Sequence, residues 1–497
     1  MVIQYFTIKT DKPALSYKIG EEITFFIFPR RNNGGCDLCD RIAYKIEADD
    51  GGREEGVALC NPEQYATVKY TAKAPGFVRI LVKALNEETA ISFNDVAPGD
   101  STDDNFFYPF STCAGVELEK VKPLVTPPQD FDIYWDSLVK TVEEFTPELL
   151  LADQYFTKVP EDIACHDVRI STPQGRPASG YICKPKKEGK YPIIISFNGY
   201  SLAGGVPRWE RGAICIHVNA HGIENGLPIQ AMNQKYGKTI TGRYGFDEEE
   251  NKKPETCYWQ GMLLRDLCAL KYAKSLKEWD GKTIIATGGS QAAFQAICVA
   301  AHDPDVSFLN TTVPWFCDDL ARNQNLISPV FPSPKGKGIE YFYNVCQAHK
   351  IKCPVNVMLR LGEPTCVPYG IMAFYNALDT KKKLVLEHGS EHSQRPFEMR
   401  SFTYYSGEIR LGKYRHYTGK MVEVIGFSSR KDEEKFTADI GPHFAFKTFA
   451  LDEQPTRNVL YKEEGDETIY SLCENAWFDT FFENGKLIES RYTFIEE

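Results

Sequence analysis

The sequence predicts an α/β protein in which a doubly wound sheet is flanked by an N-terminal β-sandwich-like domain and a small C-terminal β-rich module. Three observations lead to this fold class. Residues 1–118 contain strand-like runs separated by turn residues, residues 125–400 alternate apolar strands with helical segments, and residues 405–497 return to strand-like alternation. A chain of 497 residues exceeds what one hydrophobic core can serve, so several domains are expected.

The N-terminal domain contains three clear strand candidates. Residues 22–28, 66–72 and 77–83 are rich in β-branched and aromatic residues, and turn residues separate them at the short spacing of a sandwich. No catalytic constellation occurs there, which favours a packing or binding role. Cys36 and Cys39 form a lone CxxC pair, whereas structural zinc requires four ligands. The sequence therefore predicts no metal and no cofactor.

The middle domain begins after a linker. Residues 121–128 contain three prolines, which disfavour both helix and central strand. A helix is expected over residues 130–144 from its 3.6-residue apolar spacing. Continuous apolar runs at 191–197 and 213–218 are typical of parallel strands that are covered on both faces. Further strands are predicted at 308–314, 355–361 and 383–387, with helices at 260–275 and 370–378.

A serine stands at the sharpest turn of this domain. Residues 283–287 form a β-branched strand, and Gly288-Gly289-Ser290-Gln291-Ala292 leads from it into a helix-forming run. Strand, glycine turn, serine and helix is the nucleophile elbow of α/β-hydrolases. The usual pattern is Gly-x-Ser-x-Gly, so Ala292 replaces the last glycine.

A serine nucleophile needs a base, and the base needs a carboxylate that holds it in one tautomer. In α/β-hydrolases the order along the chain is serine, acid, histidine. Glu363 directly follows the strand at 355–361, and His392 lies just beyond the strand at 383–387. Both positions fall at the carboxyl ends of strands, where open parallel sheets bind ligands. We predict Ser290, Glu363 and His392 as the catalytic triad.

Alternatives exist for two members of the triad. Asp318 and Asp319 follow the strand at 308–314, from which some hydrolases take their acid. His388 competes with His392, but it lies closer to its strand and has less freedom to reach over the sheet.

An oxyanion hole requires two backbone N–H donors aimed at the developing charge. The amide of Gln291, directly after the nucleophile, is the first candidate. The second is the amide of Tyr200, in the glycine-containing loop that follows the strand at 191–197. An ordinary β-to-α turn is the alternative interpretation of this loop.

Taken together, these residues resemble the acetyl xylan esterases and cephalosporin C deacetylases among the carbohydrate esterases. The resemblance covers residues 125–400. The similar motifs, in order, are Pro128-Gln-Asp-Phe-Asp-Ile-Tyr-Trp135, Phe197-Asn-Gly-Tyr200, Gly288-Gly-Ser-Gln-Ala-Ala293, Glu363-Pro-Thr-Cys-Val-Pro368 and Ala373-Phe-Tyr-Asn376. The sequence departs from the family at Ala292 and Ala293, where the family has glycines, and at Glu363, where it has Asp.

The resemblance implies a serine esterase that removes acetyl groups from acetylated sugars or xylo-oligosaccharides. Two other interpretations remain open: another α/β-hydrolase that cleaves short-chain esters or peptides, and an inactive homologue that binds carbohydrate or protein. Members of the family tend to form ring-like oligomers, so a homo-oligomer is also compatible with the sequence.

The composition of the chain argues against certain classes of partner and indicates a cellular compartment. The net charge of -11 argues against nucleic acid, which requires a basic face. No apolar run reaches the length of a membrane span, so no membrane partner is expected. The N-terminus lacks the features of a secretory signal, and fifteen cysteines without one indicate a reducing compartment. We expect a cytoplasmic protein.

Overall fold

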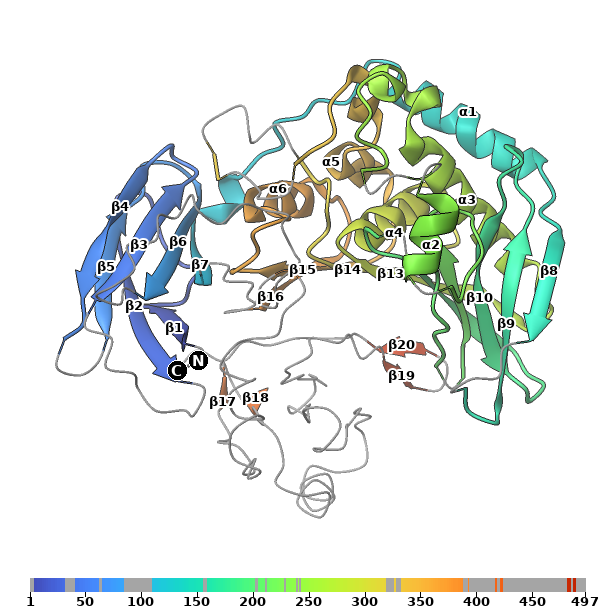
Figure 1. The fold of residues 1–497 in the computed structure, drawn as a ribbon, viewed down its shortest axis with the longest axis horizontal. Helices are drawn as coiled ribbons and strands as arrows, with labels where there is room; N and C mark the ends of the chain where they lie inside the picture. Colours follow the sequence, from blue (N-terminus) through green and yellow to red (C-terminus); the bar gives the residue numbers. More distant parts are fainter. Residues whose placement is uncertain are drawn as a thin grey trace, which may run out of the picture.

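A computed structural model describes residues 4–31, 41–61, 65–84, 110–154, 159–201, 204–210, 212–227, 229–237, 240, 243–318, 326–327, 332–387, 392, 416–417, 421–422, 481–483 and 486–488. These residues form N-terminal strands, a large mixed sheet with its helices, and two short strand pairs toward the C-terminus (Figure 1). Cys36 and Cys39 lie outside the described residues, as does most of the predicted C-terminal module.

Two antiparallel sheets form the N-terminal part. One contains β1 (Gln4–Thr10), β2 (Glu22–Arg31) and β5 (Ala66–Thr71), and the other has the order β4 (Arg53–Leu59), β3 (Arg41–Ala48), β6 (Gly76–Ala84) and β7 (Phe110–Val116). Strand β5 alternates strictly, burying Val68 and Tyr70 while Lys69 points to solvent. Side chains of both sheets, such as Phe25 of β2 and Ile80 of β6, share one apolar core. The packing is that of a β-sandwich.

The middle of the chain is built on one nine-stranded sheet. Its order is β16 (Lys382–Glu387), β15 (Val355–Arg360), β14 (Phe308–Thr312), β13 (Trp279–Gly289), β11 (Tyr191–Phe197), β12 (Ile214–Asn219), β10 (Ala178–Pro185), β9 (Ile163–Ile170) and β8 (Leu149–Gln154). From β16 to β12 all neighbours are parallel. This strand order, with helices between the parallel strands, confirms the α/β-hydrolase fold that the sequence predicts.

The antiparallel side of this sheet was not anticipated from the sequence. Strands β10, β9 and β8 pair antiparallel with β12 and with one another. Leu149 and Leu150 of the edge strand β8 are 42% and 59% exposed. An edge strand with outward apolar residues carries little of the periodicity that marks a buried strand, so pairing with β9 decides its conformation.

Six α-helices accompany the sheet within the described residues: α1 (Phe131–Glu144), α2 (Ile229–Tyr236), α3 (Tyr258–Lys274), α4 (Gln291–His302), α5 (Asn344–Gln347) and α6 (Pro368–Ala377). Short 3-10 turns lie at Leu118–Lys120, Glu250–Lys252, Pro254–Thr256, Lys337–Tyr341 and Ala348–Lys350. Figure 1 shows α3 to α6 gathered over one face of the sheet. Helix α4 contacts β11, β13 and β14, so the helix after Ser290 is held by the centre of the sheet.

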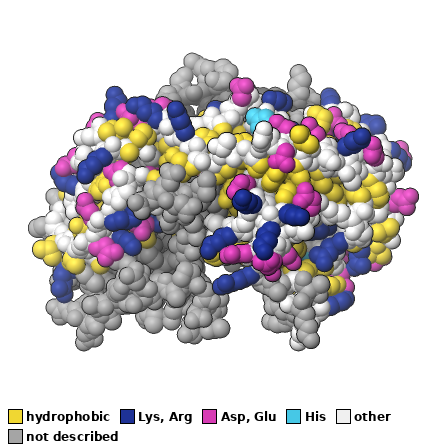
Figure 2. Space-filling model, turned by 90° about the horizontal axis from the view of Figure 1, so that it is seen from above, with side chains coloured by type: hydrophobic (Ala, Val, Ile, Leu, Met, Phe, Trp, Pro, Cys, Tyr) yellow, Lys and Arg dark blue, Asp and Glu magenta, His cyan; other side chains and the backbone are white. Residues whose placement is uncertain are grey.

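The two strand pairs near the C-terminus are β17 (His416–Tyr417) with β18 (Met421–Val422), and β19 (Phe481–Glu483) with β20 (Lys486–Ile488). Both pairs fall inside residues 405–497, for which the sequence predicts a β-rich module. No helix among the described residues combines the length and apolar character needed to cross a membrane. On the face drawn in Figure 2, acidic and basic side chains are intermingled.

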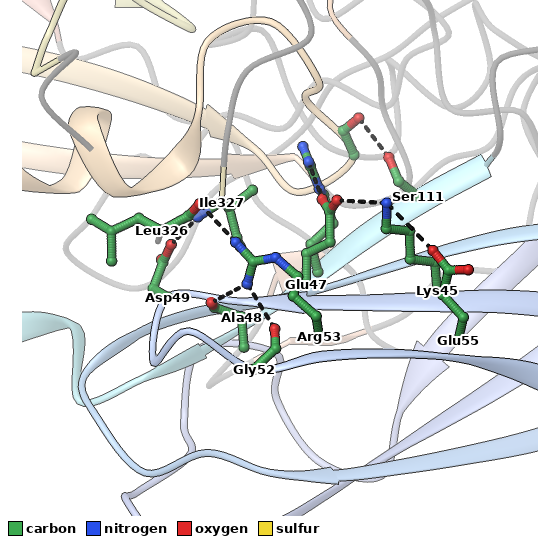
Figure 3. A network of polar contacts seen from close by, with 12 residues as sticks. Lys45, Glu47, Ala48, Asp49, Gly52, Arg53, Glu55, Ser111, Leu326 and Ile327 are labelled. Atoms are coloured by element: carbon green, nitrogen blue, oxygen red, sulfur yellow. Dashed lines mark hydrogen bonds and ion pairs between the residues drawn. The ribbon is translucent and has the colours of Figure 1, made fainter. Parts of the chain in front are cut away.

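The N-terminal sandwich is bonded to the middle domain through polar contacts of Asp49 and Arg53 (Figure 3). Arg53 donates from Nη2 to the carbonyl oxygen of Leu326 at 2.8 Å. The next amide, that of Ile327, donates to Oδ1 of Asp49 at 2.9 Å. Asp49 is 6% exposed, so its bond to Ile327 is shielded from water, whereas Arg53 lies at the exposed rim of the junction. A buried, hydrogen-bonded carboxylate such as Asp49 favours one relative placement of the two domains.

Candidate active site

Ser290 stands between β13 and α4 in a strained conformation. Its φ is 55° and its ψ is -125°, a region that non-glycine residues rarely adopt. Two backbone bonds hold it there: the Ser290 amide donates to the Thr312 carbonyl at 2.9 Å, and the Trp315 amide donates to the Ser290 carbonyl at 3.2 Å. Strain that is fixed by neighbouring strands in this way is characteristic of functional positions. It is the backbone of a nucleophile elbow.

The turn depends on one glycine in particular. A Cβ added to Gly288 would lie 2.3 Å from the carbonyl carbon of Ala292, which is a backbone atom that cannot move aside. At Gly289 the nearest atoms would be 3.6 Å away, in ordinary contact. Ala292 is 5% exposed and belongs to the apolar core of the domain, and Ala293 is fully buried. The structure therefore accommodates the alanines that depart from the family pattern.

The predicted oxyanion loop is tied to the elbow by glutamine side chains. The carbonyl of Asn198 accepts a hydrogen bond from Nε2 of Gln295 at 2.9 Å and a longer one from Nε2 of Gln291 at 3.4 Å. Oε1 of Gln291 in turn accepts the hydroxyl of Tyr244 at 2.8 Å. The Tyr200 ring stacks on Tyr244 with centroids 4.5 Å apart. The two candidate amides, those of Tyr200 and Gln291, thus belong to one bonded unit.

Gln291 is also the first residue of α4. Amides in the first turn of a helix have no carbonyl partner within the helix, and the helix dipole makes them favourable sites for negative charge. The position of Gln291 therefore suits the stabilisation of an oxyanion.

A buried histidine, His217 on β12, forms hydrogen bonds with side chains at the start of the same loop. Nε2 of His217 lies 2.7 Å from Oδ1 of Asn198, and Nδ1 lies 2.8 Å from Oγ of Ser196. Burial lowers the pKa of His217 to about 3, so the ring is neutral at ordinary pH. The neutral ring donates to the Asn198 amide oxygen and accepts from the Ser196 hydroxyl.

Glu363 and His392 meet at the same edge of the sheet. Nδ1 of His392 lies 2.8 Å from Oε2 and 2.9 Å from Oε1 of Glu363. Glu363 is fully buried, while the His392 side chain is 27% exposed. The amides of Thr365 and Cys366 donate to Oε1 of Glu363 at 2.6 and 2.9 Å, which fixes the carboxylate. A buried carboxylate that accepts an Nδ1–H leaves Nε2 of the ring available as a base.

Two further contacts position this pair. Arg360 donates from Nη1 to the carbonyl oxygen of His392 at 2.6 Å. Ser111, on β7 of the N-terminal sandwich, donates its hydroxyl to the carbonyl oxygen of Gly362 at 2.9 Å. The residue before Glu363 is therefore held by the other domain.

The predicted residues are placed as follows. Ser290 comes after β13, Glu363 after β15 and His392 after β16, and these strands are parallel members of one sheet with β14 between the first two. Parallel strands bring their carboxyl ends to one edge. Among the described residues, no hydrogen bond joins the Ser290 hydroxyl to the His392 ring. Such bonds are often long before a substrate binds.

The alternative acid is engaged elsewhere. Oδ2 of Asp318 accepts the amide of Leu124 at 2.5 Å, so this buried carboxylate holds the linker between the domains. Asp319 and His388 lie outside the described residues.

Sequence reasoning missed several supporting residues. Gln295 lies four positions after Gln291 in an otherwise apolar helix, and His217 interrupts an apolar strand. A polar residue inside a buried run was the available signal, because such a residue requires a partner. Arg360 and Cys366 gave no comparable signal, since the residue that both contact, His392, is distant in the sequence.

Comparison with known proteins shows that part of this chain is similar to one protein family. Residues 114–327 match the family model described as acetyl xylan esterase. An acetyl esterase of Xylanibacter ruminicola, Axe7A, is 24% identical over 302 residues, which span 56% of this chain and 66% of that relative. The chain thus spans slightly less than two thirds of the curated relative.

Solved structures of the same kind are similar. The acetyl xylan esterase from Paenibacillus sp. R4 is 20% identical, covering 56% of this chain and 95% of its own, with a TM-score of 0.46. Acetyl xylan esterase 1 from Thermoanaerobacterium sp. JW/SL YS485 is 19% identical, covering 58% of this chain and 98% of its own, with a TM-score of 0.46.

The family match contains the oxyanion loop and Ser290 but ends before Glu363 and His392. The acid and the base therefore rest on the geometry described above. The match confirms the resemblance that the sequence predicts: residues 114–327 are similar to the acetyl xylan esterases.

Proposed function

We propose that this chain is a serine esterase that removes acetyl groups from acetylated sugars or xylo-oligosaccharides. The observation that carries the proposal is the Glu363–His392 pair, with Nδ1 2.8 Å from a fully buried carboxylate. Glu363 follows β15 and His392 follows β16, and both strands run parallel to β13, which leads into the strained Ser290. The relation to acetyl xylan esterases supports a carboxylic ester as the substrate class.

The proposed reaction proceeds through an acetyl-enzyme. The Ser290 hydroxyl oxygen attacks the acetyl carbonyl while Nε2 of His392 takes its proton. Glu363 accepts the hydrogen bond from Nδ1–H and stabilises the cationic ring. The protonated ring then gives its proton to the departing sugar oxygen. Water repeats the sequence on the acetyl-enzyme and releases acetate.

The negative charge of the tetrahedral intermediate is assigned to the amides of Tyr200 and Gln291. Each preorganised donor lowers such a barrier by roughly 3–4 kcal/mol. Support comes from the bonds of Gln295 and Gln291 to the Asn198 carbonyl, which hold this loop against the elbow. A cytoplasmic location and a homo-oligomeric assembly remain part of the proposal.

The test is acetate release from p-nitrophenyl acetate and from acetylated xylo-oligosaccharides. Ser290→Ala should remove nearly all activity. Ser275→Ala, at an exposed serine whose hydroxyl donates to the Tyr272 carbonyl at 2.7 Å, is the matched control and should keep wild-type rates. Wild-type activity no greater than that of Ser290→Ala would overturn the proposal.

Two rival activities are separated by further measurements. Faster turnover of longer acyl chains or of peptides than of acetyl sugars would favour another α/β-hydrolase activity. Failure of a fluorophosphonate probe to label Ser290 in the folded protein would favour the inactive homologue.

A further inference from the structure

Three different metal-binding side chains, one of them the proposed base His392, lie close together. Oε of Glu363, Sγ of Cys366 and Nδ1 of His392 all lie within 4.8 Å of one another. The individual separations are 3.9 Å from Sγ to Nδ1 and 2.8 Å from Nδ1 to Oε2. Within the described part of the chain, no other set of three histidine, cysteine or acidic side chains is gathered in this way.

Two of the three separations are close to those of a zinc site. With bonds of about 2.0–2.3 Å to nitrogen, oxygen and sulfur, tetrahedral zinc places its ligand atoms roughly 3.4–3.6 Å apart. The Sγ to Nδ1 distance must shorten by a few tenths of an ångström, and the Nδ1 to Oε2 distance must lengthen by about half an ångström. Both changes involve the ring of His392, whose side chain is 27% exposed.

The surroundings match those of metal-binding carboxylates. Glu363 and Cys366 are three positions apart in the loop before α6, the short spacing that zinc sites use for two of their ligands. Oε1 of Glu363 is already held by the amides of Thr365 and Cys366. Hydrogen bonds to a ligating carboxylate are the usual outer support of a metal site. Oε2, which lies 2.8 Å from Nδ1 of His392, is the oxygen we assign to the cation.

We propose that Glu363, Cys366 and His392 form an inhibitory site for a thiophilic divalent cation such as Zn²⁺ or Cd²⁺. Carboxylate, imidazole and thiolate are all ligands of zinc, whereas Mg²⁺ prefers oxygen ligands alone. The thiolate and the carboxylate balance the two charges of the cation. This site differs in role from a catalytic metal site, because a cation bound there opposes the proposed reaction.

The inhibition follows because the neutral His392 ring carries one proton, and cation binding decides which ring nitrogen holds it. When the cation bonds to Nδ1 of His392, that proton moves to Nε2, and the thiol proton of Cys366 passes to solvent. Nε2–H cannot accept the proton of the Ser290 hydroxyl. The cation also occupies the carboxylate that would have oriented the ring. This consequence rests on the proposed function, whereas cation binding does not.

The experiment combines a binding measurement with an activity measurement on the full-length protein. Cd²⁺ or Co²⁺ is titrated while the ultraviolet thiolate-to-metal absorption band is recorded, and esterase rates are measured over a Zn²⁺ series. Cys366→Ser and Cys366→Ala should lose the band and need at least about 100-fold more Zn²⁺ for equal inhibition, since losing an outer-shell partner alone costs roughly 10–100-fold. Each rate is compared with that of the same variant treated with a chelator.

Cys353→Ser is the matched control. Cys353 is also buried, and burial raises the pKa of its thiol to about 12. This variant should show the wild-type band and Zn²⁺ inhibition, and Mg²⁺ should inhibit none of the proteins. Active protein with no band, or inhibition that is equal in Cys366→Ser and wild type, overturns the cation site. Absence of activity in chelated wild type, with the band intact, overturns the proposed function instead.

Discussion

At the scale of single residues, the chemistry depends on which carboxylate holds the histidine. Glu363 bonds to His392 and to two backbone amides, whereas Asp318 bonds to the linker amide of Leu124. The longer side chain of Glu363 reaches the ring without help from any other carboxylate. The two acids can therefore be distinguished by substitutions that keep their shape.

Glu363→Gln removes the charge but keeps the volume. Without a carboxylate the ring is no longer held with its proton on Nδ1, and kcat should fall by about 10³–10⁴-fold, as when the acid of a catalytic triad becomes an amide. Steady-state kinetics on p-nitrophenyl acetate measures the loss. Asp318→Asn should keep kcat within a few-fold of wild type. A greater loss in Asp318→Asn would reassign the acid.

Gly288→Ala should disrupt the elbow. The new methyl group would stand 2.3 Å from the backbone of Ala292, and relieving such a contact costs about 1–3 kcal/mol or more. We expect a lower free energy of unfolding and a displaced Ser290. Gly289→Ala, which adds a methyl group in ordinary contact with Thr312, is the control. Equal stability of the two variants in denaturant unfolding would contradict this account of the turn.

At the scale of elements, α4 and the loop after β11 act as one unit. Gln295 lies on α4, and its Nε2 bonds to the Asn198 carbonyl, two residues before the Tyr200 amide. His217 holds the side chain of the same asparagine from β12. A shift of this loop would move the proposed oxyanion donor Tyr200 while leaving the proposed nucleophile Ser290 in place.

Gln295→Met should lower kcat by about tenfold or more, because misplacement of a positioning group by 1 Å can cost about 100-fold. KM should change less than kcat, since the oxyanion forms only after binding. Gln347→Met is the control: Gln347 is equally buried and bonds to His302 at 2.7 Å, remote from the loop. If both variants lose stability and neither loses kcat, the role of Gln295 is purely structural.

The sandwich and the acid loop are the second pair of coupled elements. Ser111→Ala leaves the Gly362 carbonyl without its hydroxyl donor, which costs roughly 1 kcal/mol and loosens the loop that carries Glu363. We expect a decrease of a few-fold in kcat. Ser16→Ala removes a bond to Pro13 inside the sandwich and serves as the comparison. Identical kinetics for the two variants would show that the sandwich does not influence the site.

At the scale of the whole molecule, buried neutral histidines link stability to pH. Burial lowers the pKa of His217 and His302 to about 3 and that of His221 to about 4. The unfolded chain binds protons at these residues near pH 6.5, whereas the folded chain does not. The stability that these three neutral histidines contribute is therefore fully present above pH 6.5 and is lost as the pH falls toward 3–4.

His302→Gln isolates one of these contributions. His302 stacks on Trp135 with centroids 4.1 Å apart, away from the proposed triad. Each such histidine adds about 1.4 kcal/mol per pH unit to the slope of unfolding free energy. Urea unfolding between pH 6 and pH 5 should therefore show a slope smaller by that amount in the variant. An unchanged slope would mean that His302 is protonated in the folded protein.

The sequence by itself determined the features that depend on neighbouring residues. Apolar runs predicted the parallel strands, and the glycine turn predicted the elbow at Ser290. The order of Ser290, Glu363 and His392 predicted that they follow strands of one sheet. The acetyl xylan esterase resemblance was likewise carried by short, ordered motifs, and the family match confirms it.

Only the tertiary structure decided the contacts between distant residues. Strands β8 to β10 form an antiparallel side because they pair with β12, and Gln295 supports a loop almost a hundred positions earlier in the chain. Ser111 reaches Gly362 across 251 positions. Cys366 joins Glu363 and His392 in a cluster that no local pattern indicates. Such contacts form only when the sheet is assembled, because strand pairing sets which side chains meet.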